Sequence, residues 1–231
     1  MNSTIEILDE TIHRDLKLDF NAARSASRKE RLLPVVISEF YALMFHYPIV
    51  LVKDKETGEF TCSVLLGVNS EANLLDGKDI VNDEGLPLNI RRLPLVAVAP
   101  PADATESRPL IAINMASPGI GQGEPFLHSK PAMFESAISA LGQLYEGLSA
   151  TQAYVRTCVD LDLIAKINAE IRYPDKPSLT LEGLYNIDTT KIAQLSARDH
   201  DSKNRFLDIA SYAYAQNFSL YNMKKLAPLI S

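Results

Sequence analysis

The hydrophobic periodicity of this chain changes once along its length, and that change constrains the fold more than any other feature. Before Met115, short apolar runs rich in β-branched residues lie between turns and prolines. After Pro131, apolar residues recur three and four positions apart. The first pattern is typical of strands and the second of amphipathic helices. We therefore expect an α+β fold, with an antiparallel or mixed sheet from the N-terminal half packed by C-terminal helices.

Four runs in the first half carry the strand pattern. Residues 49–53 and 60–66 flank a charged turn that contains Gly58, so they predict a hairpin. Residues 93–99 and 110–115 are short apolar runs bounded by prolines. They predict two further strands.

The second half is dominated by the helical pattern. It predicts a helix that begins at Pro131, is interrupted near Gly147 and continues its apolar face to Ile167. Residues 178–187 leave room for a short hairpin, and a final helix is expected over 202–217.

Composition excludes several functional classes. The 231 residues contain 23 Lys+Arg against 29 Asp+Glu, and a net charge of −6 disfavours a general nucleic-acid binder. No apolar stretch approaches the ~20 residues that a membrane helix needs, so we expect no transmembrane segment. The chain shows no repeat and no linker. We expect a single domain over residues 1–231, in which residues 1–30 form a polar N-terminal arm.

The two cysteines and the N-terminal residues give indications of the cellular compartment of the protein. Cys62 and Cys158 match no zinc or redox spacing. Two buried free thiols in a reducing compartment are favoured over a single disulfide in a secreted protein. The N-terminal residues lack the basic and apolar regions of a signal peptide. We therefore expect a soluble cytoplasmic protein, while leaderless export to the cell surface stays open.

Charge is distributed unevenly along the chain. Arg14–Arg31 carries six basic residues against three acidic ones. This segment is either a contact for an anion or acidic partner or, as we favour, a solvated arm. Residues 71–84 collect five carboxylates, but Lys78 occupies the third position of a calcium loop that would begin at Asp76. We therefore expect a solvated loop there.

Motifs for catalysis and cofactors are absent from the sequence. The glycine-rich segment 118–125 follows a predicted strand, yet its third glycine comes one position early for a dinucleotide fingerprint, and Glu124 would repel phosphate. The four histidines are too scattered for a metal-ligand set. Asp199-His200-Asp201 is interpreted as a polar turn. The sequence therefore predicts no cofactor, no metal and no catalytic residue.

Two adjacent arginines are candidates for ligand binding. Arg91 and Arg92 stand directly before an apolar strand, where one guanidinium group could clamp a carboxylate or phosphate. The favoured alternative is a structural ion pair with the acidic segment just upstream.

Short motifs along about residues 10–228 resemble those of one known family, in the same order. The matching segments are Glu39-Phe40 with Tyr47-Pro48-Ile49-Val50, Asn73-Leu74, Ile90-Arg91-Arg92-Leu93-Pro94, Gly123-Glu124-Pro125-Phe126, Leu181-Glu182-Gly183-Leu184-Tyr185 and Ala213-Tyr214-Ala215. Together they resemble the SapC family of bacterial proteins. Leu93 replaces an aromatic residue that is usual in the family.

The resemblance implies a limited role. SapC-like proteins are named for a bacterial surface-layer role, and no reaction is established for the family. A peptide-transporter permease shares the name, but the missing membrane span excludes that assignment. Family members tend to be encoded beside outer-membrane receptors and flavin-dependent halogenase-like enzymes. This association implies an accessory role in nutrient uptake or modification.

We therefore hypothesise an accessory or binding protein that binds a protein partner or a small ligand without catalysis, with homo-oligomer formation left open. The candidate binding residues are Arg91, Arg92, Glu39, Asn73 and Glu124. One alternative is an enzyme that partners halogenase-like oxidative modification. Its carriers would be Glu39, His46, Arg91, Arg92 and Glu124. The other alternative is a self-assembling surface-layer subunit.

Overall fold

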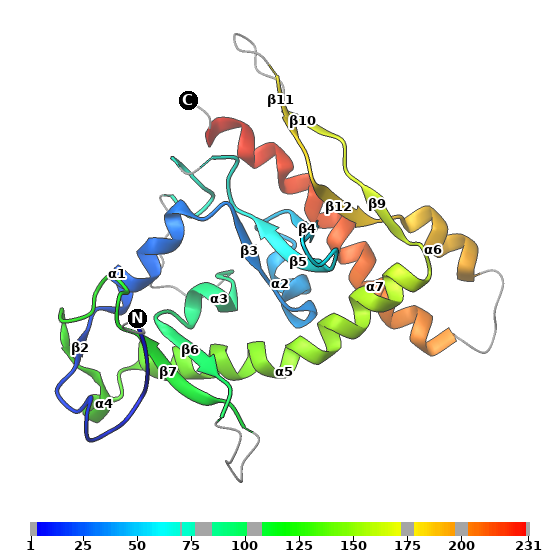
Figure 1. Cartoon of the computed structure of the whole chain (residues 1–231). Helices are drawn as coiled ribbons and strands as arrows, with labels where there is room; N and C mark the ends of the chain where they lie inside the picture. Colours follow the sequence, from blue (N-terminus) through cyan, green and yellow to red (C-terminus); the bar gives the residue numbers. More distant parts are fainter. Residues whose placement is uncertain are drawn as a thin grey trace. The chain divides into compact units, whose positions relative to one another are not determined.

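The computed structural model of the chain describes residues 4–69, 71–76, 85–100, 108–171, 178–196 and 203–229 (Figure 1). The chain divides into two compact units, each built from two stretches of sequence. Unit 1 comprises Met1–Ser27 and Asp79–Glu146, and unit 2 comprises Arg28–Lys78 and Gly147–Ser231. Both units combine helices with antiparallel strands, which confirms the α+β prediction.

Unit 1 is organised around a three-stranded antiparallel sheet. Its central strand β7 (Leu110–Asn114) pairs with β1 (Ile5–Ile7) on one side and β6 (Leu95–Val98) on the other. The two strands predicted in this region are therefore confirmed. A smaller ladder joins β2 (Lys17–Leu18) to β8 (Glu124–Pro125). The short helices of this unit are α1 (Phe20–Ser25), α3 (Leu88–Arg91) and α4 (Phe126–Ser129).

Three phenylalanines form the centre of the unit 1 core. The ring centroid of Phe126 lies 5.9 Å from that of Phe20 and 5.1 Å from that of Phe134. Around them pack buried aliphatic side chains of the sheet, including Leu95 and Ile113. The sheet and the helices thus bury their apolar faces against the same aromatic cluster.

The N-terminal segment is folded into unit 1. Asp19 caps α1 by accepting hydrogen bonds from the amides of Asn21 and Ala22, at 2.9 and 3.2 Å. Arg24 is fully buried, and its Nη2 donates to the carbonyl of Arg91 at 3.0 Å. The expectation that Arg14–Arg31 is a solvated arm is therefore wrong at Arg24. That expectation was based on the charge of the segment alone, whereas a guanidinium group can be buried where it finds hydrogen-bond acceptors.

Three glycines hold the segment 118–125 in tight turns. Gly119, Gly121 and Gly123 all have positive φ. A Cβ at Gly119 would lie 2.3 Å from the carbonyl oxygen of Asp19, so no other residue fits there. The sequence prediction of a tightly turned loop agrees with this geometry.

Unit 2 contains a five-stranded antiparallel sheet in the order β3-β5-β4-β12-β9. The predicted hairpin is confirmed as β4 and β5, which pair from Ile49 opposite Val64 to Lys53 opposite Phe60. The strands are β3 (Leu32–Pro34), β4 (Ile49–Lys53), β5 (Phe60–Leu65), β9 (Ile164–Lys166) and β12 (Leu184–Ile187), with β10 (Ala169–Ile171) pairing β11 (Leu179–Leu181). The helical segments are η1 (Ala26–Lys29), η2 (Ile37–Glu39), α2 (Phe40–Leu43), α6 (Thr189–Ser196), α7 (Lys203–Ser219) and η3 (Leu220–Leu229).

The hairpin expected over 178–187 is wrong in its pairing. Its two strands exist, but β11 pairs with β10 and β12 lies between β4 and β9. The strands β9 and β10 were hidden by the apolar spacing that continues to Ile167, which resembled helix. Periodicity predicts which residues share a face, but it carries no information about the strand that pairs with them.

The long helix α5 (Ala132–Asp160) is continuous, so the predicted interruption near Gly147 is wrong. It ends earlier than expected, at a left-handed residue, Asp162, with φ 51°. The amide of Leu163 donates to the carbonyl of Cys158 and that of Asp162 to Val159, at 2.9 and 3.0 Å. This is a Schellman ending, built here without glycine.

The cysteines are free and buried, Cys62 on β5 and Cys158 on α5. Burial raises the pKa of Cys158 to about 12 and raises that of Cys62 as well. Since the thiolate is the reactive form, we expect both native thiols to react with Ellman's reagent at least about 100-fold more slowly than in the unfolded chain. Stopped-flow absorbance in buffer and in guanidinium chloride measures both rates. Rapid native labelling of either thiol would contradict the expectation.

Candidate functional site

The five candidate residues from the sequence fall in different units. Arg91, Arg92 and Glu124 belong to unit 1, and Glu39 and Asn73 belong to unit 2. The surroundings of each are therefore described within its own unit.

Glu39 and Asn73 each hold local backbone. Glu39 is buried, and its Oε2 accepts a hydrogen bond from the amide of Val36 at 3.0 Å, which closes the start of a helical turn. Asn73 is 1% exposed; its Nδ2 donates to the carbonyl of Glu30 and its Oδ1 accepts from the amide of Leu75. Both side chains thereby satisfy buried backbone groups.

Arg91 and Arg92 lie in a helical turn, whereas the sequence predicted the end of a strand. Arg91 ends α3, and the strand begins only at Leu95. Arg92 Nε donates to Asn89 Oδ1 at 2.7 Å, and Arg92 Nη1 donates to the carbonyl of Leu95 at 2.6 Å. Burial lowers the pKa of Arg92. The ion pair was predicted with the acidic segment 71–84, of which Asp79, Asp83 and Glu84 lie outside the described residues, so it stays a prediction.

Glu124 is the exposed member of the set. It lies on β8, opposite Leu18 of β2 in the ladder register. It is exposed on this two-stranded ladder, and its expected repulsion of phosphate at the loop stays a prediction.

An apolar groove in unit 1 is the candidate site for a ligand. It consists of two adjacent hollows, of about 710 Å³ and about 540 Å³. Four residues line both hollows, and they connect the two: Pro109, Leu110, Ile111 and Ile138. One wall therefore comes from strand β7 and the other from helix α5. The groove is of the size that small ligands occupy in proteins.

The lining of the groove is apolar at its base and charged at isolated points. Leu127 and Phe134 contribute to the first hollow, and Leu141 and Tyr145 to the second. The charged residues that line the groove are Glu10, Lys130 and Glu135 in the first hollow and Arg108 and Glu146 in the second. Neither histidine nor cysteine is among the described lining residues. This lining is suited to holding an apolar molecule with a polar end.

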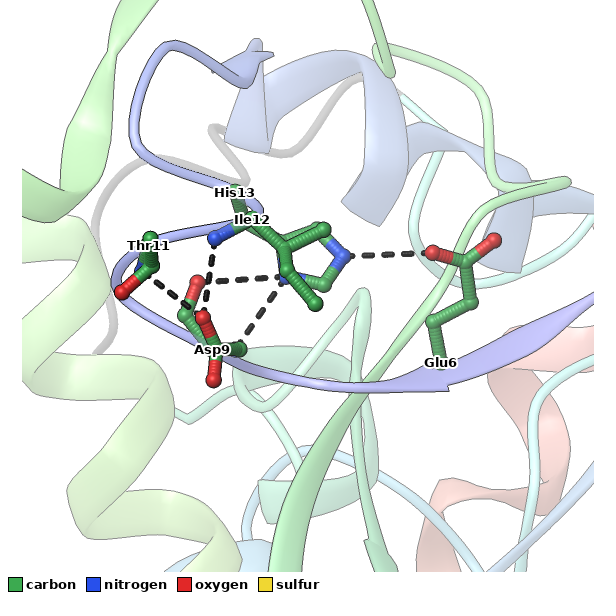
Figure 2. Close-up of polar contacts among 5 residues, drawn as sticks. All are labelled: Glu6, Asp9, Thr11, Ile12 and His13. Carbon is green, nitrogen blue, oxygen red and sulfur yellow. Dashed lines mark hydrogen bonds and ion pairs between the residues drawn. The ribbon is translucent and has the colours of Figure 1, made fainter.

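A hydrogen-bonded turn supports the N-terminal part of the groove (Figure 2). Asp9 Oδ1 accepts from the amides of Thr11 and Ile12 at 2.7 and 2.8 Å. These two bonds, that of Ile12 foremost, lower the pKa of Asp9. Nδ1 of the buried His13 lies 3.1 Å from the Asp9 amide nitrogen and 3.3 Å from the Asp9 carbonyl oxygen, and its Nε2 lies 3.2 Å from Glu6 Oε2.

This turn matters because the residues between Glu6 and His13 reach the groove. Ile7, Leu8 and Glu10 line the first hollow. The amide of Leu8 also donates to the carbonyl of Ile111 at 2.9 Å, which joins the turn to β7. The sequence did contain a signal for this arrangement, since Glu6, Asp9 and His13 are spaced like a local hydrogen-bonded turn, but it was missed among the polar N-terminal residues.

The described part of the chain lacks two features of other site classes. No three His, Cys, Asp or Glu side chains among those residues gather in a way that could hold a metal ion. No helix within the same ranges is both long enough and apolar enough to cross a membrane.

Comparison with known proteins gives one match. The family model described as SapC matches residues 8–226, nearly the whole chain. No curated protein and no solved structure matches it. The order of motifs found by reading the sequence therefore agrees with a family model that spans both units.

Proposed function

The chain belongs to the SapC family, and we propose that it is a non-catalytic accessory protein that binds a small apolar ligand in the unit 1 groove. The observation that carries this proposal is the continuous apolar lining shared by the two hollows. Burying a ligand's apolar surface there would supply most of the affinity. The charged residues near the groove would orient a polar end of the ligand without supplying an acid and a base that converge on one point.

The cellular setting that we propose is the one suggested by the family resemblance, a bacterial surface-layer or outer-membrane uptake system. An accessory protein of such a system would hold or deliver an apolar compound to a partner. We also propose Arg91, Arg92, Glu39, Asn73 and Glu124 as contacts for that partner, and Glu124 is the exposed member of this set.

A fluorescent probe tests the groove directly. N-phenyl-naphthylamine is a neutral apolar dye whose emission rises in apolar sites, and we expect it to bind the chain saturably. Ile138→Glu should weaken binding at least about tenfold, because Ile138 lines both hollows and a carboxylate there would have to be desolvated by the dye.

The matched control is Leu161→Glu, which places the same charge at an exposed leucine of unit 2. Circular dichroism and thermal melting establish that both variants fold. Unchanged dye affinity in a folded Ile138→Glu protein, or equal losses in both variants, would contradict the groove as the binding site.

A further inference from the structure

Unit 2 presents an exposed aromatic face that the groove of unit 1 does not involve. We use the name for five side chains that are 47% to 70% exposed: Tyr41, Phe45, Tyr214, Phe218 and Tyr221. A single exposed aromatic residue is normal on a protein surface. A contiguous group of them marks a site of interaction, because the apolar area remains in contact with water until something covers it.

The five side chains form two neighbouring stripes. Tyr41 and Phe45 are four residues apart, at α2 and just after it. Tyr214, Phe218 and Tyr221 follow each other at intervals of four and three along α7 and η3, which places them on one helical side. Helix α2 contacts α7, and the rings of Phe45 and Phe218 meet edge to face at 6.2 Å between centroids.

The stripe of Tyr214, Phe218 and Tyr221 faces outward because polar side chains next to it in the sequence are bonded to the interior of unit 2. Ser219 Oγ accepts from the amide of Ile49 at 2.7 Å, and Asn222 Nδ2 donates to the carbonyl of Met44 at 2.7 Å. Both side chains are buried. The neighbouring residues Phe218 and Tyr221 are therefore turned to the surface by bonds that the interior requires.

Two lysines accompany the aromatic face. Lys224 Nζ lies 3.6 Å from the ring centroid of Tyr221, and Lys225 Nζ donates to the carbonyl of Phe45 at 3.1 Å. Both lysines line a shallow hollow of about 260 Å³ together with Phe45, Phe218 and Tyr221. Among the described residues of that hollow none is acidic, so the face is locally cationic on a chain whose net charge is −6.

We propose that the aromatic face docks on an anionic lipid surface. Tyrosine and phenylalanine with flanking lysines are suited to the boundary between headgroups and acyl chains, where rings enter and ammonium groups meet lipid phosphates. Lysine is depleted in protein–protein interfaces. A symmetric pairing with a second copy of this chain would bring four lysines, Lys224 and Lys225 of each copy, into one interface, where their like charges repel.

Vesicle sedimentation tests this proposal with the full chain. We expect the chain to pellet with vesicles of phosphatidylcholine and phosphatidylglycerol and much less with phosphatidylcholine alone. High salt should release most of it, because the attraction of lysine to phosphate is screened. The double variant Phe45→Ser/Phe218→Ser and the single variant Lys224→Glu should each lower the bound-to-free ratio at least about tenfold.

The matched controls lie elsewhere on the same unit. Leu161→Ser removes an exposed apolar side chain and Lys166→Glu reverses an exposed charge, and both should pellet like the wild type. Unchanged pelleting of both test variants overturns the proposal, as does equal binding to neutral vesicles. If the wild type ignores vesicles and light scattering shows a dimer that Phe45→Ser/Phe218→Ser dissociates, the face belongs to a second copy instead.

Discussion

Replacing Phe126 with alanine should lower the free energy of unfolding by about 3–5 kcal/mol, the largest single effect that we expect in this chain. The side chain is 1% exposed and meets Phe20 edge to face. Truncation removes the aromatic surface buried between Phe20 and Phe134 and leaves a cavity, because neighbours on two different helices can close it only in part. Urea unfolding followed by circular dichroism measures the loss.

The control is Phe45→Ala, the same substitution at a side chain that is 58% exposed. It should change the free energy of unfolding by no more than ~0.5 kcal/mol. Phe126→Ala should also weaken binding of the dye, because Phe134 packs on Phe126 and lines the groove. A loss below ~1 kcal/mol for Phe126→Ala would mean that the aromatic cluster is not the centre of the unit 1 core.

The second large effect concerns two glycines of the same helix, for which we expect opposite results. Gly147→Ala should destabilise the protein by roughly 1–3 kcal/mol. A Cβ at Gly147 would lie 2.8 Å from Cβ and Cγ2 of the buried Val36. The missing side chain lets α5 approach this segment closely enough for Thr151 Oγ1 to accept from the amide of Ile37 at 3.0 Å.

Gly142→Ala is the matched control, since no described atom outside its own stretch of helix lies within 4 Å of the Cβ it would add. At Gly142 only the usual helix preference for alanine over glycine should act, so this substitution should raise the free energy of unfolding by about 0.5–1 kcal/mol. Thermal and urea unfolding measure the change in stability of Gly147→Ala and Gly142→Ala relative to the wild type. A gain at both positions would show that Gly147 was retained for no steric reason.

Features of the fold that depend on neighbouring residues could be predicted from the sequence. The hairpin of β4 and β5 was predicted because two β-rich runs flank a turn, and the structure pairs them residue by residue. The start of α5 was predicted from the period that begins at Pro131. These features depend on neighbours within a few positions, so the residues themselves contain the information.

Features that depend on residues far apart in the sequence could not be predicted from it. The buried Arg24 looked like part of a solvated basic arm, because the carbonyl of Arg91 that accepts its hydrogen bond is far along the chain. Gly147 looked like a helix breaker for the same reason, since Val36 is invisible from its sequence neighbours. The candidate groove was also missed, although Leu110 and Ile111 had been assigned to a predicted strand and Ile138 to a predicted helix.

The sequence by itself determined the α+β class, the hairpin of β4 and β5, the strands β6 and β7, the start of α5 and membership of the SapC family, because each depends on local periodicity or on motif order. Only the tertiary structure decided that β12 pairs with β4 and β9, that β7 and α5 enclose an apolar groove, and that Phe45 lies against Phe218. The physical reason is that periodicity specifies which side of an element is apolar, whereas the partner of that side is chosen by packing among all the elements at once.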